Sequence, residues 1–164
     1  MRMLDKLLQG VEVRSLVGDG TVAVGRLEFD SRKVVPGTLF FATRGTQADG
    51  HAYIPAAVAA GAAAVVCEEL PAERPVGVTF VQVPDSTVAL GQVASAFYGH
   101  PSRRLKLVGV TGTNGKTTTA TLLYRMFRRL GYKAGLISTV VYCVDDREIP
   151  STHTTPDSIR LNAM

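Results

Sequence analysis

The sequence lacks tryptophan, has only 7% aromatic residues, and contains just two cysteines, Cys67 and Cys143. Two cysteines cannot build a disulfide framework, so we expect a reducing compartment. The net charge is only +4, and no block of lysine and arginine concentrates it. With so few aromatic rings to stack on bases, this composition argues against a nucleic-acid partner.

Long apolar runs are also missing. A membrane-spanning helix needs roughly 18 consecutive apolar residues, and the longest candidate, residues 54–67, is interrupted by Pro55 and Gly61. The first residues lack the apolar core of a signal peptide. Because 46% of the 164 residues are hydrophobic and 20% are charged, the composition is that of a globular protein. We therefore expect a soluble, cytoplasmic protein without a membrane partner.

Apolar runs alternate with turn residues through the first hundred positions. We expect helices over residues 4–8, 53–60 and 87–98, and strands over residues 39–42, 62–67 and 78–83. The third helix should direct Val88, Val93 and Ala94 inward. Strands that alternate with helices predict an α/β fold.

A polar, turn-prone stretch at residues 99–104 predicts a domain boundary, with residues 1–104 before it and residues 105–164 after it. The second part should contain a helix at residues 116–130, strands at residues 105–110, 134–139 and 140–144, and a last helix with Pro156 at its first position. This pattern begins a βαβ unit without completing a parallel sheet, which needs cover on both faces. We expect a fragment of a longer protein; one small mixed domain is the alternative.

Residues 109–118 read Gly-Val-Thr-Gly-Thr-Asn-Gly-Lys-Thr-Thr and join a predicted strand to a predicted helix. This is the context of a phosphate-binding loop, in which glycines let N–H groups converge on an anion at a helix N-terminus. Lys116 can reach the β- and γ-phosphates, and the Thr117 hydroxyl can ligate Mg²⁺. The common pattern has glycine where Val110 stands, so an ordinary strand–turn–helix connection is the alternative.

The loop at residues 108–119 resembles the nucleotide loop of the Mur ligases, the ATP-dependent amide-bond-forming enzymes of peptidoglycan synthesis. Residues 29–51, with Asp-Ser-Arg, Pro-Gly-Thr-Leu-Phe-Phe-Ala and Gly-Thr-Gln-Ala-Asp-Gly-His, resemble the N-terminal domain of the members that add the third and fourth amino acids. The His-Thr-Thr-Pro segment at residues 153–156 resembles the third-residue branch. The resemblance implies addition of diaminopimelate, or less commonly L-lysine, to UDP-N-acetylmuramoyl-L-alanyl-D-glutamate.

The resemblance also implies a three-domain, monomeric enzyme that uses ATP and Mg²⁺ and acts on small molecules. Residues 1–104 would form a small mixed-sheet UDP-binding domain, and residues 105–164 would begin a P-loop-type ATP-binding central domain. The implied ATP-binding residues are Gly112, Thr113, Asn114, Gly115, Lys116, Thr117 and Thr118, with Lys116 catalytic and Thr117 a metal ligand. The implied substrate-binding residues are Phe29, Ser31, Thr46, Gln47, Ala48, His153, Thr154 and Thr155. His153 stands where the family often has asparagine.

The implied reaction converts the D-glutamyl γ-carboxylate into an acyl phosphate, which the incoming amine then attacks while phosphate leaves. The remaining catalytic groups of the family would lie beyond Met164, so we expect no catalysis by this chain alone. Three other functions stay open: a ligase that adds D-Ala-D-Ala as the fourth step, a non-catalytic nucleotide-sugar-binding module, and an unrelated P-loop kinase or GTPase.

Simpler structural roles also stay open for several polar residues. Asp30 and Asp49 could cap local turns, with His51 structural rather than catalytic. The cationic residues on or after the predicted loop helix could form a solvated face near its C-terminus; they are Arg125, Arg128, Arg129 and Lys133.

Overall fold

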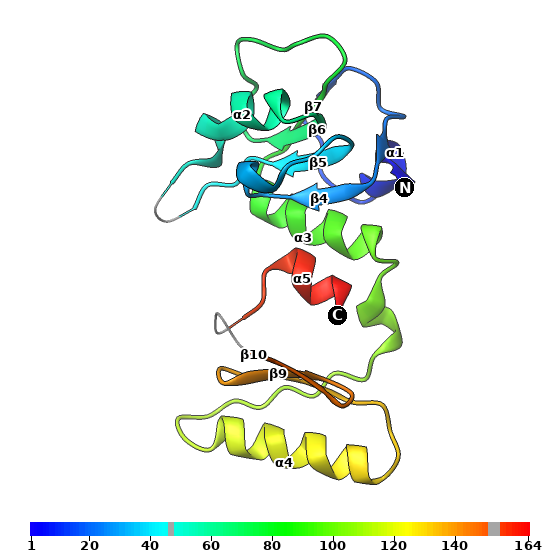
Figure 1. The fold of residues 1–164 in the computed structure, drawn as a ribbon, viewed down its shortest axis with the longest axis vertical. Coiled ribbons are helices and arrows are strands. Elements are labelled where there is room, and N and C mark those ends of the chain that lie inside the picture. Colours follow the sequence, from blue (N-terminus) through cyan, green and yellow to red (C-terminus); the bar gives the residue numbers. More distant parts are fainter. Residues whose placement is uncertain (46–47, 151–154) are drawn as a thin grey trace. The chain divides into compact units, whose positions relative to one another are not determined.

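The computed structural model describes residues 1–45, 48–150 and 155–164. It divides into two compact units, Met1–Pro101 and Ser102–Met164, and each has its own sheet (Figure 1). The elements of the first unit are β1 (Arg2–Met3), α1 (Leu4–Leu7), β2 (Ser15–Val17), β3 (Ala23–Val24), β4 (Arg26–Glu28), the 3-10 helix η1 (Ser31–Lys33), β5 (Thr38–Phe41), the 3-10 helix η2 (Gly50–Tyr53), α2 (Ile54–Ala59), β6 (Ala62–Cys67), β7 (Thr79–Gln82) and α3 (Ser86–Phe97).

The main sheet of the first unit has the strand order β2-β7-β6-β5-β4. Strands β4, β5, β6 and β7 are parallel, and β2 pairs antiparallel with β7. The segments that follow the four parallel strands therefore emerge at one side of the sheet, called here the carboxyl edge. Their described residues are 29–32, 42–45, 48–50, 68–69 and 83–86. In open sheets of this kind, ligands bind outside the carboxyl ends of the strands.

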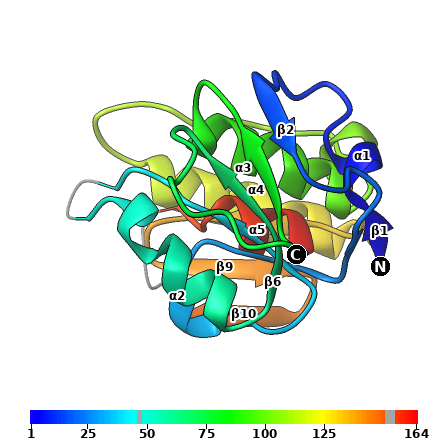
Figure 2. The ribbon, with the colours of Figure 1, turned by 90° about the horizontal axis from the view of Figure 1, so that it is seen from above.

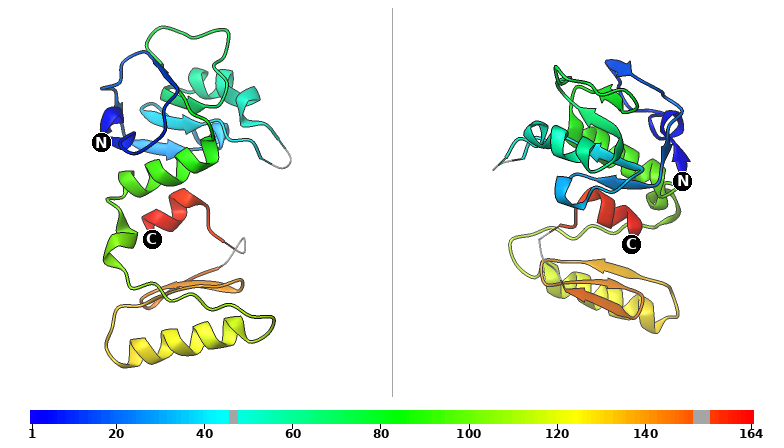
Figure 3. Two further views of the ribbon diagram at one scale, coloured as in Figure 1. Left: turned by 180° about the vertical axis from the view of Figure 1, so that it is seen from behind. Right: turned by 45° about the horizontal axis from the view of Figure 1, so that its top comes forward.

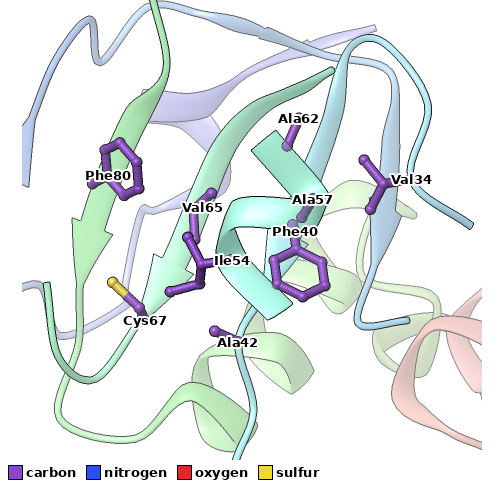
Figure 4. Close-up of a cluster of buried hydrophobic side chains, with 9 residues drawn as sticks. All are labelled: Val34, Phe40, Ala42, Ile54, Ala57, Ala62, Val65, Cys67 and Phe80. Carbon is purple, nitrogen blue, oxygen red and sulfur yellow. The ribbon is translucent and has the colours of Figure 1, made fainter. Parts of the chain in front are cut away.

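Alternate side chains of the strands fill two apolar layers, one on each face of the sheet. Helix α2 covers one face, where Phe40, Val65 and Phe80 belong to a cluster of buried side chains (Figure 4). Helix α3 covers the opposite face, as Figures 1 and 3 show. Both helices were predicted within one or two residues of their ends, and the expected α/β fold is confirmed.

Helix α3 begins where the sequence predicts, but one of its residues does not point inward as expected. The Asp85 carboxylate accepts hydrogen bonds from the N–H groups of Thr87 and Val88, both at 2.8 Å, and so caps the helix. The buried face is made by Ser86, Ala89, Leu90, Val93 and Ala94. Val88 is 56% exposed because it lies on the opposite side of the helix from that face.

The described residues of the second unit form a three-stranded antiparallel sheet, whereas the sequence pattern predicted the start of a parallel one. Its elements are α4 (Lys116–Arg129), β8 (Gly135–Ile137), β9 (Val141–Val144), β10 (Arg147–Pro150) and α5 (Ser158–Ala163), and the 3-10 helix η3 (Pro101–Arg104) spans the boundary. The strand order is β10-β9-β8, and β9 and β10 lie side by side in Figure 2. Strand β10 was not predicted; it follows a tight turn at Asp145, whose φ is +49°.

Side chains of α4 bind this turn. The hydroxyl of Tyr124 donates to the carbonyl of Asp145, and the Arg128 guanidinium lies 2.6 Å from an Asp146 carboxylate oxygen and 3.3 Å from one of Asp145. Arg128 is therefore an ion-pairing residue that joins the helix to the β9–β10 turn. As the sequence analysis expected, Arg128 lies in the last turn of α4, and the Asp146 side chain that it pairs with is 88% exposed.

Two further expectations for the second unit differ from the structure. Residues 105–110 form no strand, and Leu105, Leu107 and Val108 are 67%, 91% and 64% exposed. A strand requires a hydrogen-bonded neighbour, and the only sheet among the described residues of this unit is the antiparallel one. Pro156 precedes the helix cap instead of occupying the first helical position, because Asp157 caps α5 by accepting from the N–H of Arg160 at 2.9 Å.

Across residues 1–45, 48–150 and 155–164, no helix is both long and apolar enough to cross a membrane.

Candidate active site

Phe29 and Ser31, two of the predicted substrate-binding residues, follow β4 at the carboxyl edge. Between them Asp30 accepts from the backbone N–H of Arg32 at 3.1 Å and from its guanidinium at 2.9 Å. These bonds from Arg32 lower the pKa of Asp30 to about 2, so the carboxylate is charged at neutral pH. Asp30 is thus a turn cap, as the simpler interpretation predicted, and the turn leaves Phe29 39% exposed at the edge.

Ala48, a third predicted substrate-binding residue, belongs to the base of a short hairpin after β5. The N–H of Gly45 donates to the carbonyl of Ala48 at 3.0 Å, and the N–H of Gly50 donates to the carbonyl of Thr43 at 2.8 Å. Because β4 and β5 are adjacent parallel strands, this hairpin and the Phe29–Ser31 turn emerge from neighbouring strands. Thr46 and Gln47 lie outside the described residues.

Gly50 lets the two sides of this hairpin approach each other. A Cβ atom at Gly50 would lie 2.6 Å from the carbonyl oxygen and 2.7 Å from the nitrogen of Thr43, and backbone atoms cannot rotate away. We expect Gly50→Ala to lower the free energy of unfolding of the first unit by about 1–3 kcal/mol. Urea titration followed by amide NMR peaks of β5 and β6 measures this.

Gly20→Ala is the matched control for Gly50→Ala. A Cβ atom at Gly20 would meet only Leu16 side-chain carbons, at 3.7 and 3.9 Å, which is ordinary contact. We expect its unfolding free energy to stay within about 0.5 kcal/mol of the unmodified protein. Equal losses in the two variants would contradict the close-approach argument.

Arg44 and Glu68 are two edge residues that the sequence analysis missed. The Arg44 guanidinium lies 3.2 Å from a Glu68 carboxylate oxygen, and the other Glu68 oxygen accepts from the N–H and the hydroxyl of Ser86 at 3.1 and 2.9 Å. These contacts connect the segments after β5 and β6 to the start of α3. Ser86 and Glu68 are 18 positions apart, so no local pattern in the sequence could have indicated the contact.

The predicted phosphate loop lies in the second unit and leads directly into α4. Gly115, at the N-cap of the helix, has a φ of +78°, a conformation that side chains other than glycine rarely adopt. The Lys116 ammonium group donates to the carbonyls of Gly112 and, at 3.2 Å, Thr113. The first-turn N–H groups of a helix have no intrahelical acceptor, and here they face an exposed loop.

These groups suit a polyphosphate with a divalent cation. Lys116 is exposed and supplies a mobile positive charge, and the half-buried Thr117 supplies a hydroxyl at the helix start. Backbone N–H groups and the positive end of the helix dipole favour an anion at the same place. The remaining predicted ATP-binding residues all lie in this exposed loop or first turn; they are Gly112, Thr113, Asn114, Gly115 and Thr118.

The structure thus groups the predicted residues in two places: Phe29, Ser31 and Ala48 at the carboxyl edge of the first unit, and residues 112–118 at the start of α4. Thr155 is exposed and precedes α5. His153 and Thr154 lie outside the described residues.

Two family descriptions match the chain in succession. "Mur ligase family, catalytic domain" matches residues 24–98, and "Mur ligase middle domain" matches residues 110–164.

Curated relatives share much of the sequence. The UDP-N-acetylmuramoyl-L-alanyl-D-glutamate--2,6-diaminopimelate ligase of Bacteroides thetaiotaomicron is 53% identical over 99% of this chain and 34% of its own length. The protein of the same name from Bacteroides fragilis is 56% identical over 98% of this chain and 33% of its own length. The chain therefore spans about a third of the length of these relatives.

Solved structures agree in fold. A crystal structure of MurF from Acinetobacter baumannii matches 79% of this chain and 28% of its own with a TM-score of 0.61 and 27% identity. A structure of a UDP-N-acetylmuramoyl-L-alanyl-D-glutamate--2,6-diaminopimelate ligase matches 99% of this chain and 32% of its own with a TM-score of 0.71 and 22% identity, which shows a common fold. The two consecutive family matches and the relatives that are more than half identical confirm the resemblance found in the sequence: the chain belongs to the Mur ligase family.

Proposed function

We propose that the chain supplies the UDP-binding unit and the ATP-phosphate loop of an ATP-dependent ligase. The ligase adds diaminopimelate to UDP-N-acetylmuramoyl-L-alanyl-D-glutamate. The observation that carries this proposal is the 53–56% identity, across nearly the whole chain, to relatives that bear this activity in their names. The geometry supports it, because Phe29, Ser31 and Ala48 follow neighbouring parallel strands at the edge where such sheets bind ligands.

The second unit supplies charge for carboxylate activation. Forming an acyl phosphate brings a carboxylate close to a polyphosphate. Both groups are negatively charged, so concentrated positive charge is needed to offset their repulsion. Lys116 and the N–H groups at the start of α4 provide that charge, and Thr117 would orient the cation. Mg²⁺, when bound, would offset further negative charge of the polyphosphate.

A ligase that adds D-Ala-D-Ala is the second candidate, because a D-alanyl-D-alanyl ligase from Acinetobacter baumannii matches 79% of this chain with a TM-score of 0.57 and 25% identity. The two candidates differ in substrate: one binds the UDP-muramoyl dipeptide and the other the tripeptide. Isothermal titration of the chain with both compounds separates them. Tighter binding of the dipeptide supports the proposal, and preference for the tripeptide would replace it with the second candidate.

The Phe29 ring is an exposed aromatic side chain at the carboxyl edge, from which the proposed uridine site can gain stacking energy. Since base–aromatic stacking is worth about 1–3 kcal/mol, we expect Phe29→Ala to weaken binding of UDP by about tenfold. Val76→Ala, which truncates a fully exposed side chain of the same unit, should leave the dissociation constant unchanged. If Phe29→Ala binds UDP as tightly as the unmodified chain, Phe29 has no place in the site.

A further inference from the structure

His51 lies on η2 and makes side-chain contacts on both ring nitrogens. It directly follows the hairpin, whose described residues are 43–45 and 48–50. Its Nδ1 atom lies 2.6 Å from an oxygen of Asp49. Its Nε2 atom accepts from the backbone N–H groups of Glu68, at 2.9 Å, and Glu69, at 3.3 Å. The side chain is only 15% exposed. One imidazole therefore joins the segment after β5 to the segment after β6.

The partners of the ring determine which nitrogen carries the proton. Both groups that face Nε2 are backbone donors, so Nε2 has to be an unprotonated acceptor. A neutral imidazole then carries its proton on Nδ1 and donates it to the Asp49 carboxylate. The backbone N–H of His51, 2.9 Å from the same oxygen, and the ring bond together hold the pKa of Asp49 below its ordinary value.

The carboxylates that lie around the ring also contact Arg44. The Arg44 guanidinium lies 3.7 Å from Asp49 and 3.2 Å from Glu68, and it also contacts Glu69. The single positive charge of Arg44 thus offsets part of the negative charge of these three carboxylates. His51 is the group that fixes geometry, because it bonds to backbone on one side and to the hairpin on the other. Its two backbone partners, Glu68 and Glu69, directly follow β6.

We propose that His51 is a positioning residue for the uridine side of the substrate site, acting as an Nδ1-protonated imidazole that holds Ala48, Asp49 and Gly50 against the end of β6. The inference rests on the proposed function, because it presupposes that the carboxyl edge binds UDP. The histidine itself touches no reacting atom. Its contribution is to keep the base of the hairpin at a fixed place on the edge, so that the edge presents one surface to the nucleotide.

Three substitutions of His51 separate its two ring contacts. Glutamine places a carbonyl oxygen near the Nε2 position and can still accept from Glu68, whereas asparagine can only replace the Nδ1 donor to Asp49. We expect His51→Asn and His51→Ala to weaken UDP binding by the 164-residue chain by about tenfold, and His51→Gln to stay within about threefold of the unmodified chain.

Two controls accompany these titrations. His100→Asn changes a histidine at the other end of α3, where the residue has a φ of +53° that asparagine tolerates, and it should leave UDP binding unchanged. Tripolyphosphate, bound by the loop at residues 112–118 in the other unit, should bind every His51 variant equally. If His51 had only a structural role, the Gln, Asn and Ala variants would all weaken UDP binding to the same extent. That pattern overturns the positioning role.

A long-range ¹H–¹⁵N spectrum of the unmodified chain tests the tautomer without any folding risk. His51→Gln assigns the ring signals by their disappearance, and the expected pattern is a protonated Nδ1 with an unprotonated Nε2. A proton on Nε2 would overturn the inference. If the unmodified chain binds UDP and His51→Ala binds it equally well, the inference about His51 is overturned while the proposed function stands. If the unmodified chain does not bind UDP, the proposed function and the inference both fail.

Discussion

On the proposed function, replacing Lys116 with alanine in a full-length ligase should reduce ATP turnover, measured as ADP release, by about a hundred- to a thousandfold or more. The ammonium group lies over the loop that begins α4, bonded to the carbonyls of Gly112 and Thr113. It can exchange these neutral partners for phosphate oxygens, whose negative charge binds an ammonium group more strongly. Alanine leaves the developing charge on the transferred phosphate without this partner.

Lys133→Ala is the matched control for the loss of one positive charge. Lys133 is exposed and follows α4, at the opposite end of the helix from the loop. We expect its turnover to equal that of the unmodified enzyme. Amide NMR shifts of residues 112–115 report whether the Lys116 variant keeps the loop conformation. Turnover near the unmodified rate in a Lys116→Ala enzyme with an intact loop would remove Lys116 from the mechanism.

The sequence predicted best those elements whose signals are local and strong. Strand β6 is a six-residue apolar run that follows Gly61, whose φ is +95°, and the structure places it at Ala62–Cys67 as expected. Strands β2 and β4 were missed because both are short and neither lies in an extended apolar run such as the one around β8. Strand β4 also contains Arg26 and Glu28, which pair with each other at 2.6 Å, and such polar edge strands lack a long apolar run.

The wrong expectations share a physical cause. Which strands pair, and which way a side chain faces, depends on the elements that lie next to them in the fold. Residues 105–110 have the composition of a buried strand, yet composition cannot supply the hydrogen-bonded partner that a strand needs. Strand β10 shows the opposite case to residues 105–110. Arg147 and Glu148 carry no apolar signal, but they form a strand because they pair antiparallel with β9. Tertiary context decided both segments.

The candidate site divides in the same way. The phosphate loop could be predicted because its glycines, lysine and threonine are contiguous and their chemistry is tied to that spacing. The contacts of His51 and Arg44 could not, since their partners Glu68 and Glu69 are distant in sequence and become neighbours only when β5 and β6 pair. A sequence pattern can identify groups that act together along the chain, whereas groups that meet across a sheet edge require the fold.

The packing that holds this edge in place predicts a large effect for Phe40→Ala. Phe40 is fully buried in the middle of β5, among Val34, Ile54, Val65 and other members of the cluster under α2 (Figure 4). Removing the ring leaves a cavity that the surrounding strands cannot close. We expect the free energy of unfolding of the first unit to fall by about 3–5 kcal/mol, a large share of the roughly 5–15 kcal/mol that stabilises a typical domain.

Urea titration of the chain, followed through amide peaks of β5, β6 and β7, reads the stability of this unit separately from that of the second. Phe40→Leu retains much of the volume and should lose less than half as much, and Val88→Ala, which truncates a 56% exposed side chain on α3, should change little. The ring acts through the sheet and not on the nucleotide, so well below the unfolding midpoint Phe40→Leu should bind UDP at the unmodified strength. A loss below about 1 kcal/mol for Phe40→Ala would mean that the α2 face is not the packed core from which the carboxyl edge gains its rigidity.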